Sequence, residues 1–326
     1  MRRGDWAHDP EAIRAAAVDT IIRVAVLVGL GVPACTIYRR CRDGGPWTLM
    51  APATVRLGTG TATRRQLARA ALLYAGEQAA LTGLDGARAH RLRRGDLPES
   101  VHLLIPAEIK VQSVPGIRVE RTHRMPPVRE RDGLPVAPME RCLVDAARCM
   151  SSRSDVAAIL TEPVQRRMLL PTTLQVEVEA ASSRGSALPR AVLGAITAGA
   201  RSVAEVDFHD WWFTHPELAR VTILFNVRLT SDAIFLGIAD GFLPELGLVL
   251  PIDSVEQHFM TPGQVEETER QHRAYRAAGL HVYGIRPSRM RSDSSGLRRD
   301  VLDAIAVAER LPTPNVLWTP DLPRAV

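Results

Sequence analysis

Lysine is almost missing from this sequence: of 41 basic side chains, Lys110 is the single lysine. Nearly all of the positive charge is therefore carried by arginine, whose guanidinium pairs with phosphate through two hydrogen bonds and also reads guanine edges. Cysteine is scarce too, with no Cys-x-x-Cys pair and no spacing to histidine that is typical of a zinc site. We expect reduced thiols, packed in helices, at all four positions. These are Cys35, Cys41, Cys142 and Cys149.

Long uncharged apolar runs are also missing. The best candidate, residues 15–35, is interrupted by Asp19 and Arg23, whereas spanning a bilayer takes roughly 18 uncharged apolar residues. The first residues carry charges where the apolar core of a signal peptide would begin. No Gly-x-Ser-x-Gly motif, phosphate-binding loop or dinucleotide fingerprint occurs in the sequence. We therefore expect a soluble protein of the cytoplasm without a membrane partner.

The charge is unevenly distributed along the chain. Residues 1–172 hold 26 basic and 17 acidic side chains, whereas residues 173–326 hold 15 and 19. A strongly basic segment favours a polyanionic partner. The charge difference between the two halves is better evidence for such a partner than the excess of arginine over lysine, because a GC-rich genome alone would produce that excess. The first half of the chain is therefore the expected region of contact with nucleic acid.

The order of the predicted elements indicates an α+β fold with several domains, since a chain of this length is expected to form two or three. We expect a winged helix-turn-helix over 1–60 and a small α+β middle domain with a helical tail over 61–182. The Ser/Gly-rich segment 181–186 is the predicted linker. An α/β sandwich follows over 186–312, with a short tail over 313–326.

The first domain is predicted from two helices and a strand pair. Apolar spacing predicts a helix over 10–28, glycines break it, and Pro33 opens a second helix that ends at Gly44 and Gly45. A β segment over 47–57 completes the pattern of a winged helix-turn-helix. In the second helix Ile37 and Cys41 are four residues apart and are expected to face the core. The predicted DNA contacts lie on the other side: Thr36, Tyr38, Arg39, Arg40 and Arg42.

The middle domain begins with a strong local signal. Thr63 is the expected N-cap of a helix, Gln66 completes a capping box three residues later, and Gly76 stops the helix. Strands are predicted near 101–106 and 116–121, and "MERCLVDAARCM" is predicted to form a helix over 139–150.

Three stretches of this half carry a resemblance to a known family: "GVPACTIYRRCRDGGPWTLMAP", "TRRQLARAALLYAG…AALTGLDGARAHRL" and "RDGLPVAPMERCLVDAAR". Over roughly residues 20–150 the chain resembles the N-terminal part of AbiEi-type antitoxins and transcriptional repressors. The resemblance implies a winged helix that binds double-stranded DNA and, for an antitoxin, a cognate toxin protein as a further partner. The family usually has a glycine and an aromatic residue after the wing proline, whereas Pro52 is followed by "ATVRL".

The last domain is predicted as a helix, a three-strand meander, a helix, a strand and a helix. Over about 186–310 this arrangement resembles actinobacterial proteins that end in a very-short-patch-repair-like member of the PD-(D/E)xK nuclease fold. The resemblance implies an oxygen-ligand site for Mg²⁺ or Mn²⁺, with Asp240 and Asp253 as metal ligands. The full set of candidate catalytic residues is Glu205, Asp240, Asp253 and His258.

One position interrupts that motif. Residues two apart in a strand point to the same face, so the family's glutamate would stand at position 251, beside Asp253. That position is Pro251, which offers no ligand atom and no N–H, and proline within sheets is confined to edges, strand starts and bulges. Glu256 at the strand end, or His258 or Arg270 as the missing basic group, remain as substitutes. The sequence therefore favours a nuclease-like domain that has lost catalysis and needs no cofactor.

Three functions stay open at this point. The favoured one is a DNA-binding transcriptional regulator of the antitoxin type with a decayed nuclease-like domain. The first alternative is an active Mg²⁺-dependent endonuclease that uses Glu205, Asp240 and Asp253. The second is a protein-interaction adaptor.

Overall fold

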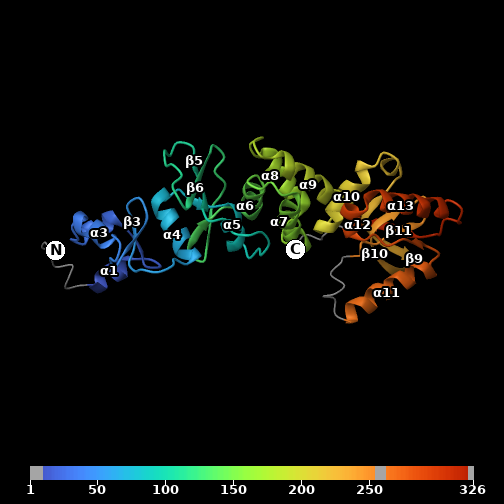
Figure 1. The fold of residues 1–326 in the computed structure, drawn as a ribbon, viewed down its shortest axis with the longest axis horizontal. Coiled ribbons are helices and arrows are strands. Elements are labelled where there is room, and N and C mark those ends of the chain that lie inside the picture. Colours follow the sequence, from blue (N-terminus) through green and yellow to red (C-terminus); the bar gives the residue numbers. More distant parts are fainter. Residues whose placement is uncertain (1–9, 254–261, 322–326) are drawn as a thin grey trace. The chain divides into compact units, whose positions relative to one another are not determined.

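The computed structural model describes residues 10–253 and 262–321 (Figure 1). The chain divides into two compact units, residues 1–146 and 147–326. Each combines helices with β-sheet, so the fold is of the α+β class, with three separate sheets in the described residues. None of the helices in these ranges has the length and apolar character that crossing a bilayer requires.

The N-terminal unit (residues 1–146) begins with a small sheet and three short helices. The elements are α1 (Pro10–Ala16), β1 (Ile21–Arg23), α2 (Val24–Gly29), α3 (Ala34–Arg40), β2 (Thr48–Ala51) and β3 (Thr54–Arg56). The strands are antiparallel in the order β1-β3-β2. Ile22, Leu27, Ile37 and Val55 are almost fully buried in their common core.

The single helix predicted over 10–28 is wrong. Asp19 and Thr20 adopt positive φ angles of 55° and 66°, which an α-helix does not contain. The chain therefore turns there, and Ile21 pairs with Arg56 in the sheet. The apolar periodicity runs on across this turn because β1 and α2 both contribute side chains to one core.

The β2–β3 hairpin is tight. Ala51 pairs directly with Thr54, so Pro52 and Ala53 alone form the turn. The Ala53 carbonyl accepts a hydrogen bond from the Val24 N–H at 2.9 Å, which holds the turn on the start of α2. The one cation of the hairpin, Arg56, is 4% exposed and donates to the Gly60 carbonyl. The hairpin thus presents no positive charge at its tip.

A second sheet fills the rest of the N-terminal unit. The helices are α4 (Arg64–Ala75), α5 (Gly83–Ala89) and α6 (Met139–Ala147), and the strands are β4 (Ala80–Leu81), β5 (Val101–Pro106), β6 (Ile117–Thr122), β7 (Arg129–Arg131) and β8 (Leu134–Val136). The strand order is β6-β5-β4-β8-β7. The predicted capping box is confirmed: Thr63 accepts from the Gln66 N–H, and the Gln66 side chain accepts from the Thr63 N–H.

The "TGLDG" stretch, which caps and opens α5, is shaped by close packing. A side chain on Gly86 would place its Cβ 2.3 Å from the Cys142 sulfur, and one on Gly83 would meet the His102 ring at 2.7 Å. Asp85 between them forms an ion pair with Arg64, whose guanidinium donates to both carboxylate oxygens at 2.7 and 2.8 Å. The motif therefore has a structural role: it fixes α4, α5 and α6 to the sheet.

A buried polar chain connects the same elements. Thr82 donates to Asp145 at 2.7 Å, and Arg141 donates to the same Asp145 oxygen at 2.8 Å. His102 lies 3.2 Å from Glu120, with Arg141 at 4.0 Å on its other oxygen. Because buried charges require partners, these residues specify how α6 packs on the sheet.

The C-terminal unit (residues 147–326) starts with helices that pack on one another. They are α7 (Arg153–Gln165), α8 (Pro171–Ala180), α9 (Ala187–Thr197) and α10 (Val203–Thr214). Contacts join α7 and α8 to α9, and α7 and α9 to α10. The predicted linker 181–186 therefore lies inside this unit and connects two packed helices. The sequence analysis predicts no helix at α9, because the Ser/Gly-rich segment before it favours a domain boundary there.

A five-stranded sheet follows, in the order β12-β11-β10-β9-β13. Its strands are β9 (Leu224–Ser231), β10 (Ile234–Leu243), β11 (Leu248–Leu250), β12 (His281–Val282) and β13 (Leu317–Pro320), and its later helices are α11 (Pro262–Ala277), α12 (Pro287–Ser292) and α13 (Ser294–Ala308). The predicted meander, helix, strand and last helix are confirmed. The strand β13 lies in the segment that we expected to be a tail.

Helices cover both faces of this sheet. Leu248 and Leu250 pack with the aromatic residues of α10 and with α12 and α13. Val249, which points the other way, packs with Tyr275 of α11. Figure 1 shows α11 on the opposite side of β10 and β9 from α13. The alternation of side chains along β11 thus produces a layered helix–sheet–helix arrangement.

Candidate functional site

The helix α3 is anchored by one apolar side. Ile37 has no exposed surface, and Cys41 packs against the same core, as the four-residue spacing predicts. The helix begins after Pro33, whose carbonyl accepts from the N–H groups of Thr36 and Ile37. Because seven residues make only two turns, this anchor fixes which side chains face solvent.

The predicted DNA contacts separate into two groups. Tyr38, Arg39 and Arg42 are exposed, whereas Thr36 and Arg40 are half-buried. Tyr38 and Arg39 belong to the helix, and Arg42 follows its last residue, Arg40. Arg39 and Arg42 therefore offer guanidinium groups to a polyanion without disturbing the core.

Arg40 has a different neighbour. Its guanidinium carbon lies 4.6 Å from the centre of the Trp47 ring, a cation–π contact. The Trp47 backbone N–H donates to the Arg40 carbonyl at 3.1 Å, so the end of α3 is joined to the chain that leads into β2. No sequence pattern predicts this pair, because the two residues are seven apart across an irregular turn.

The three described carboxylates of the nuclease-like motif lie near one another. Glu205 is in the first turn of α10, Asp240 is in β10, and Asp253 follows β11. Burial raises the Asp240 pKa to about 7. The charges on Glu205 and Asp253 contribute to this rise, because they disfavour a further negative charge beside them. The motif residues that the resemblance singled out are thus brought together. His258 lies outside the described residues.

Each of the first two carboxylates accepts hydrogen bonds from its own surroundings. Glu205 Oε2 accepts from the Arg201 backbone N–H at 2.8 Å and from the Asn226 side chain. Asp240 Oδ2 accepts from the Ile252 backbone N–H at 2.8 Å. Both oxygens therefore satisfy backbone groups at the end of a helix and a strand.

The position of Pro251 explains the hydrogen bond from the Ile252 N–H to Asp240. β11 ends at Leu250, and the Pro251 carbonyl still accepts from the Ile285 N–H at 2.8 Å on the β12 side. On the other side the next N–H, that of Ile252, donates to the Asp240 carboxylate. The proline thus stands where regular pairing with β10 stops, in keeping with its preference for strand ends.

Asp253 lies on the other side of this chain segment. Burial raises its pKa, while the nearby His272 and Arg286 lower it. The Asp253 backbone N–H donates to Ile285 at 2.8 Å. A Cβ on Gly284 would approach the Asp253 carboxylate within 2.5 Å, so the glycine leaves room for that side chain. His272 and Arg286 carry no sequence pattern that distinguishes them.

The donor set has the chemistry of a magnesium site but not its arrangement. Carboxylate oxygens suit a hard divalent cation, which would also relieve the repulsion around Asp240. In the described ranges, however, no three His, Cys, Asp or Glu side chains are grouped so that they could hold a metal ion. The oxygens Oε2 of Glu205 and Oδ2 of Asp240 are directed at N–H groups instead. The carboxylates as placed do not fit the metal that the resemblance implies.

Comparison with known proteins gives little further guidance. No family model matches the sequence, and no curated protein matches it. Among solved structures, the chain is similar to the RV2827C protein from Mycobacterium tuberculosis, with 17% sequence identity and a TM-score of 0.38. The similarity covers 58% of this chain and 78% of that one.

Proposed function

We propose that this protein binds double-stranded DNA through α3 and acts as a transcriptional regulator. The observation that carries the proposal is the exposed end of α3: Tyr38 and Arg39 on the helix, and Arg42 just after it, are exposed, whereas Ile37 is fully buried. A helix that enters a groove needs this division between a docking side and a cationic side. The basic first half of the sequence supports the same partner.

The element order supports a winged helix-turn-helix. A helix, a strand, two helices and an antiparallel hairpin follow one another from α1 to β3, and β1 completes the three-stranded sheet. The hairpin that corresponds to the wing is a two-residue turn held on α2, and its arginine is buried. We therefore assign the DNA contact to α3 and not to the hairpin. The proposal also includes an antitoxin role with a cognate toxin protein as partner. This part rests only on the resemblance to the AbiEi-type family.

Arg39→Ala should weaken DNA binding, because a neutralised phosphate contact is lost. The logarithm of the binding constant should also depend less steeply on the logarithm of the salt concentration, by about one unit for each contact removed. Fluorescence anisotropy with a random-sequence duplex over a series of salt concentrations measures both quantities. Arg40→Ala should have a smaller effect, since Arg40 already lies on Trp47.

The matched control is Arg299→Ala, because Arg299 is an exposed arginine on α13 in the other unit. Its affinity and salt dependence should equal those of the wild type. If Arg39→Ala and the control bind alike, α3 is not the contact. If the wild type shows no salt-dependent binding at all, the proposed function is wrong.

A metal-dependent endonuclease is the second candidate, favoured by the mutual repulsion around Asp240. The test is a calorimetric Mn²⁺ titration of the wild type, Pro251→Glu and Asp253→Ala. We expect binding only in Pro251→Glu, since a glutamate there restores a third oxygen donor near Asp240 and Asp253. Tight binding by the wild type that Asp253→Ala abolishes would favour the nuclease over the decayed domain.

A further inference from the structure

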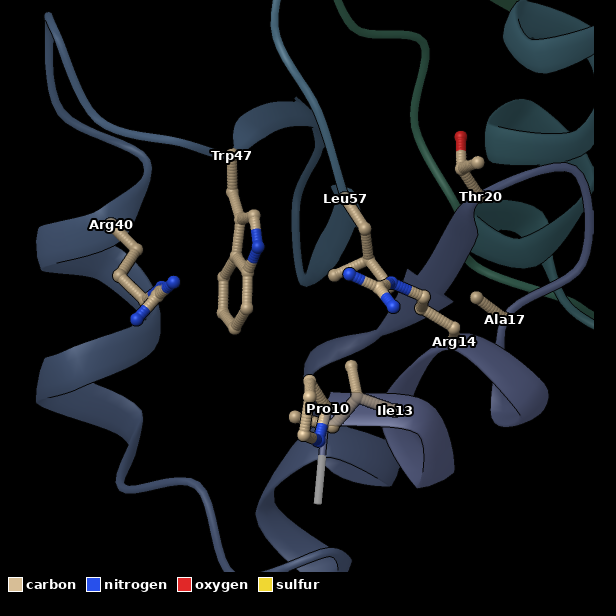
Figure 2. A pocket seen from close by; sticks show the side chains of 8 residues that line it. All are labelled: Pro10, Ile13, Arg14, Ala17, Thr20, Arg40, Trp47 and Leu57. Atoms are coloured by element: carbon tan, nitrogen blue, oxygen red, sulfur yellow. The ribbon is translucent and has the colours of Figure 1, made fainter. Parts of the chain in front are cut away.

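A cavity of about 470 Å³ opens in the N-terminal unit beside the last turn of α3. Its walls come from α1, from the end of α3 and from the segments on either side of the β2–β3 hairpin. Pro10, Ile13 and Leu57 form apolar wall, Trp47 presents its ring, and Arg14 and Arg40 supply the charge (Figure 2). Sites for small organic ligands fall in the range of roughly 300–1,000 Å³.

The lining has charge of one sign. Two arginines face the cavity, and none of the residues from 10 onward that line it is acidic. In Figure 2 the Trp47 ring lies between the guanidinium groups of Arg40 and Arg14. Arg40 covers one face of the ring at 4.6 Å, which leaves the other face toward Arg14. A cavity that is half apolar and half cationic complements an anion with an apolar body.

We propose that this cavity binds a small aromatic carboxylate, an acid with one or two rings. The ring of the ligand stacks on the face of Trp47 that Arg40 leaves open and packs against Ile13 and Leu57. Its carboxylate forms a two-pronged ion pair with Arg14, which is exposed on α1 and turned toward the cavity. A planar acid satisfies the stacking surface and the guanidinium at the same time.

Occupation of the cavity acts on the end of α3. The Trp47 backbone N–H donates to the Arg40 carbonyl at 3.1 Å, and the turn between them has no spare room, since a Cβ on Gly45 would lie 2.2 Å from the same carbonyl. A ligand on Trp47 therefore contacts the segment that positions α3, and its negative charge lies beside Arg40. This step rests on the proposed function. Bound acid lowers DNA affinity, and bound DNA lowers acid affinity by the same factor.

The test uses 1-naphthoate as the probe and the full-length protein in a calorimeter. We expect 1-naphthoate to bind, and the uncharged 1-naphthamide to bind about tenfold more weakly or worse, because it lacks the charge that Arg14 pairs with. Arg14→Gln and Trp47→Leu should each lower the affinity for 1-naphthoate by about tenfold or more. Arg118→Gln is the matched control, because Arg118 is an exposed arginine on β6 of the same unit and does not line the cavity.

Arg14→Gln keeps the assay informative even if Trp47→Leu fails to fold, since Arg14 is at the surface. The inference is overturned if 1-naphthoate does not bind, if the amide binds as well as the acid, or if Arg14→Gln has no effect. A second titration adds random-sequence duplex DNA. Acid binding with unchanged DNA affinity overturns the coupling, whereas acid binding by a protein that binds no DNA rejects the proposed function and leaves the site standing.

Discussion

Replacing Asp145 with alanine should lower the free energy of unfolding of the N-terminal unit by about 3 kcal/mol or more, because it removes one carboxylate of a buried ion pair. Asp145 has no exposed surface and Arg141 is 5% exposed. Thr82 and Arg141 both donate to one Asp145 oxygen. The substitution removes the acceptor that this guanidinium and this hydroxyl share. Urea unfolding, followed by circular dichroism, measures the change.

The control for this variant is Asp132→Asn. Asp132 also pairs with an arginine, Arg91, at 3.7 Å, but the two side chains are 64% and 77% exposed. Exposed pairs contribute about 1 kcal/mol or less, and asparagine tolerates the φ of 50° at this position, so this variant should unfold almost as the wild type does. Asp145→Asn, which keeps an acceptor oxygen, should fall between the two. A loss in Asp145→Ala no larger than that in the control would show that the buried chain does not stabilise the unit.

Asp240→Asn should stabilise the C-terminal unit above neutral pH. In the folded protein the Asp240 pKa is raised from 3.8 to about 7, so between these values the folded state holds a proton that the unfolded state has released. Wild-type stability therefore falls as the pH rises through this window and stays low above it. The asparagine never ionises, and its side-chain oxygen can still accept from the Ile252 N–H.

A pKa difference of about 3 units, from 3.8 to about 7, corresponds to about 4 kcal/mol at about 1.4 kcal/mol per unit. The expected gain at about pH 8 is smaller, about 2 kcal/mol or more, because the side chain keeps some contact with solvent. At about pH 4 the two proteins should be equally stable. Thermal or urea unfolding at both pH values gives the comparison. Asp232→Asn is the control, since Asp232 is exposed in a turn with φ 48° that asparagine also tolerates.

A loss of stability in Asp240→Asn at about pH 8 would contradict the raised pKa. It would mean that the Asp240 carboxylate is ionised and held by a positive partner, as a metal site requires. The same variant therefore bears on the second candidate function by a route that is independent of the calorimetric titration.

Elements with a local signal could be predicted from the sequence. The helix after Thr63 has its capping box and its stop within one stretch, and the strands β9, β10 and β11 carry apolar runs that are separated by turns. The strand β13 could not be predicted, because Trp318 pairs with Leu229, a partner almost ninety residues earlier. The turn at Asp19 and Thr20 was hidden by apolar spacing that continues across it.

The candidate sites show the same limit. The spacing of Ile37 and Cys41 was enough to predict the core side of α3, and the nuclease resemblance was enough to select three carboxylates that lie near one another. Neither could predict the contacts that those groups make. Arg40 on Trp47 and Asp240 on the Ile252 N–H are both pairings between elements, and pairings of this kind depend on how the chain folds back on itself.

Because Gly86 packs on the Cys142 sulfur, the rate at which this thiol reacts reports how often the N-terminal unit opens locally. Burial raises the Cys142 pKa far above its ordinary value, so the thiol does not react while the unit is closed. Cys35 and Cys149 are exposed and react with a thiol reagent from the start. Slow labelling of Cys142 therefore requires a transient separation of α5 from α6. The labelling rate measures the local stability of this contact under conditions where the protein stays folded.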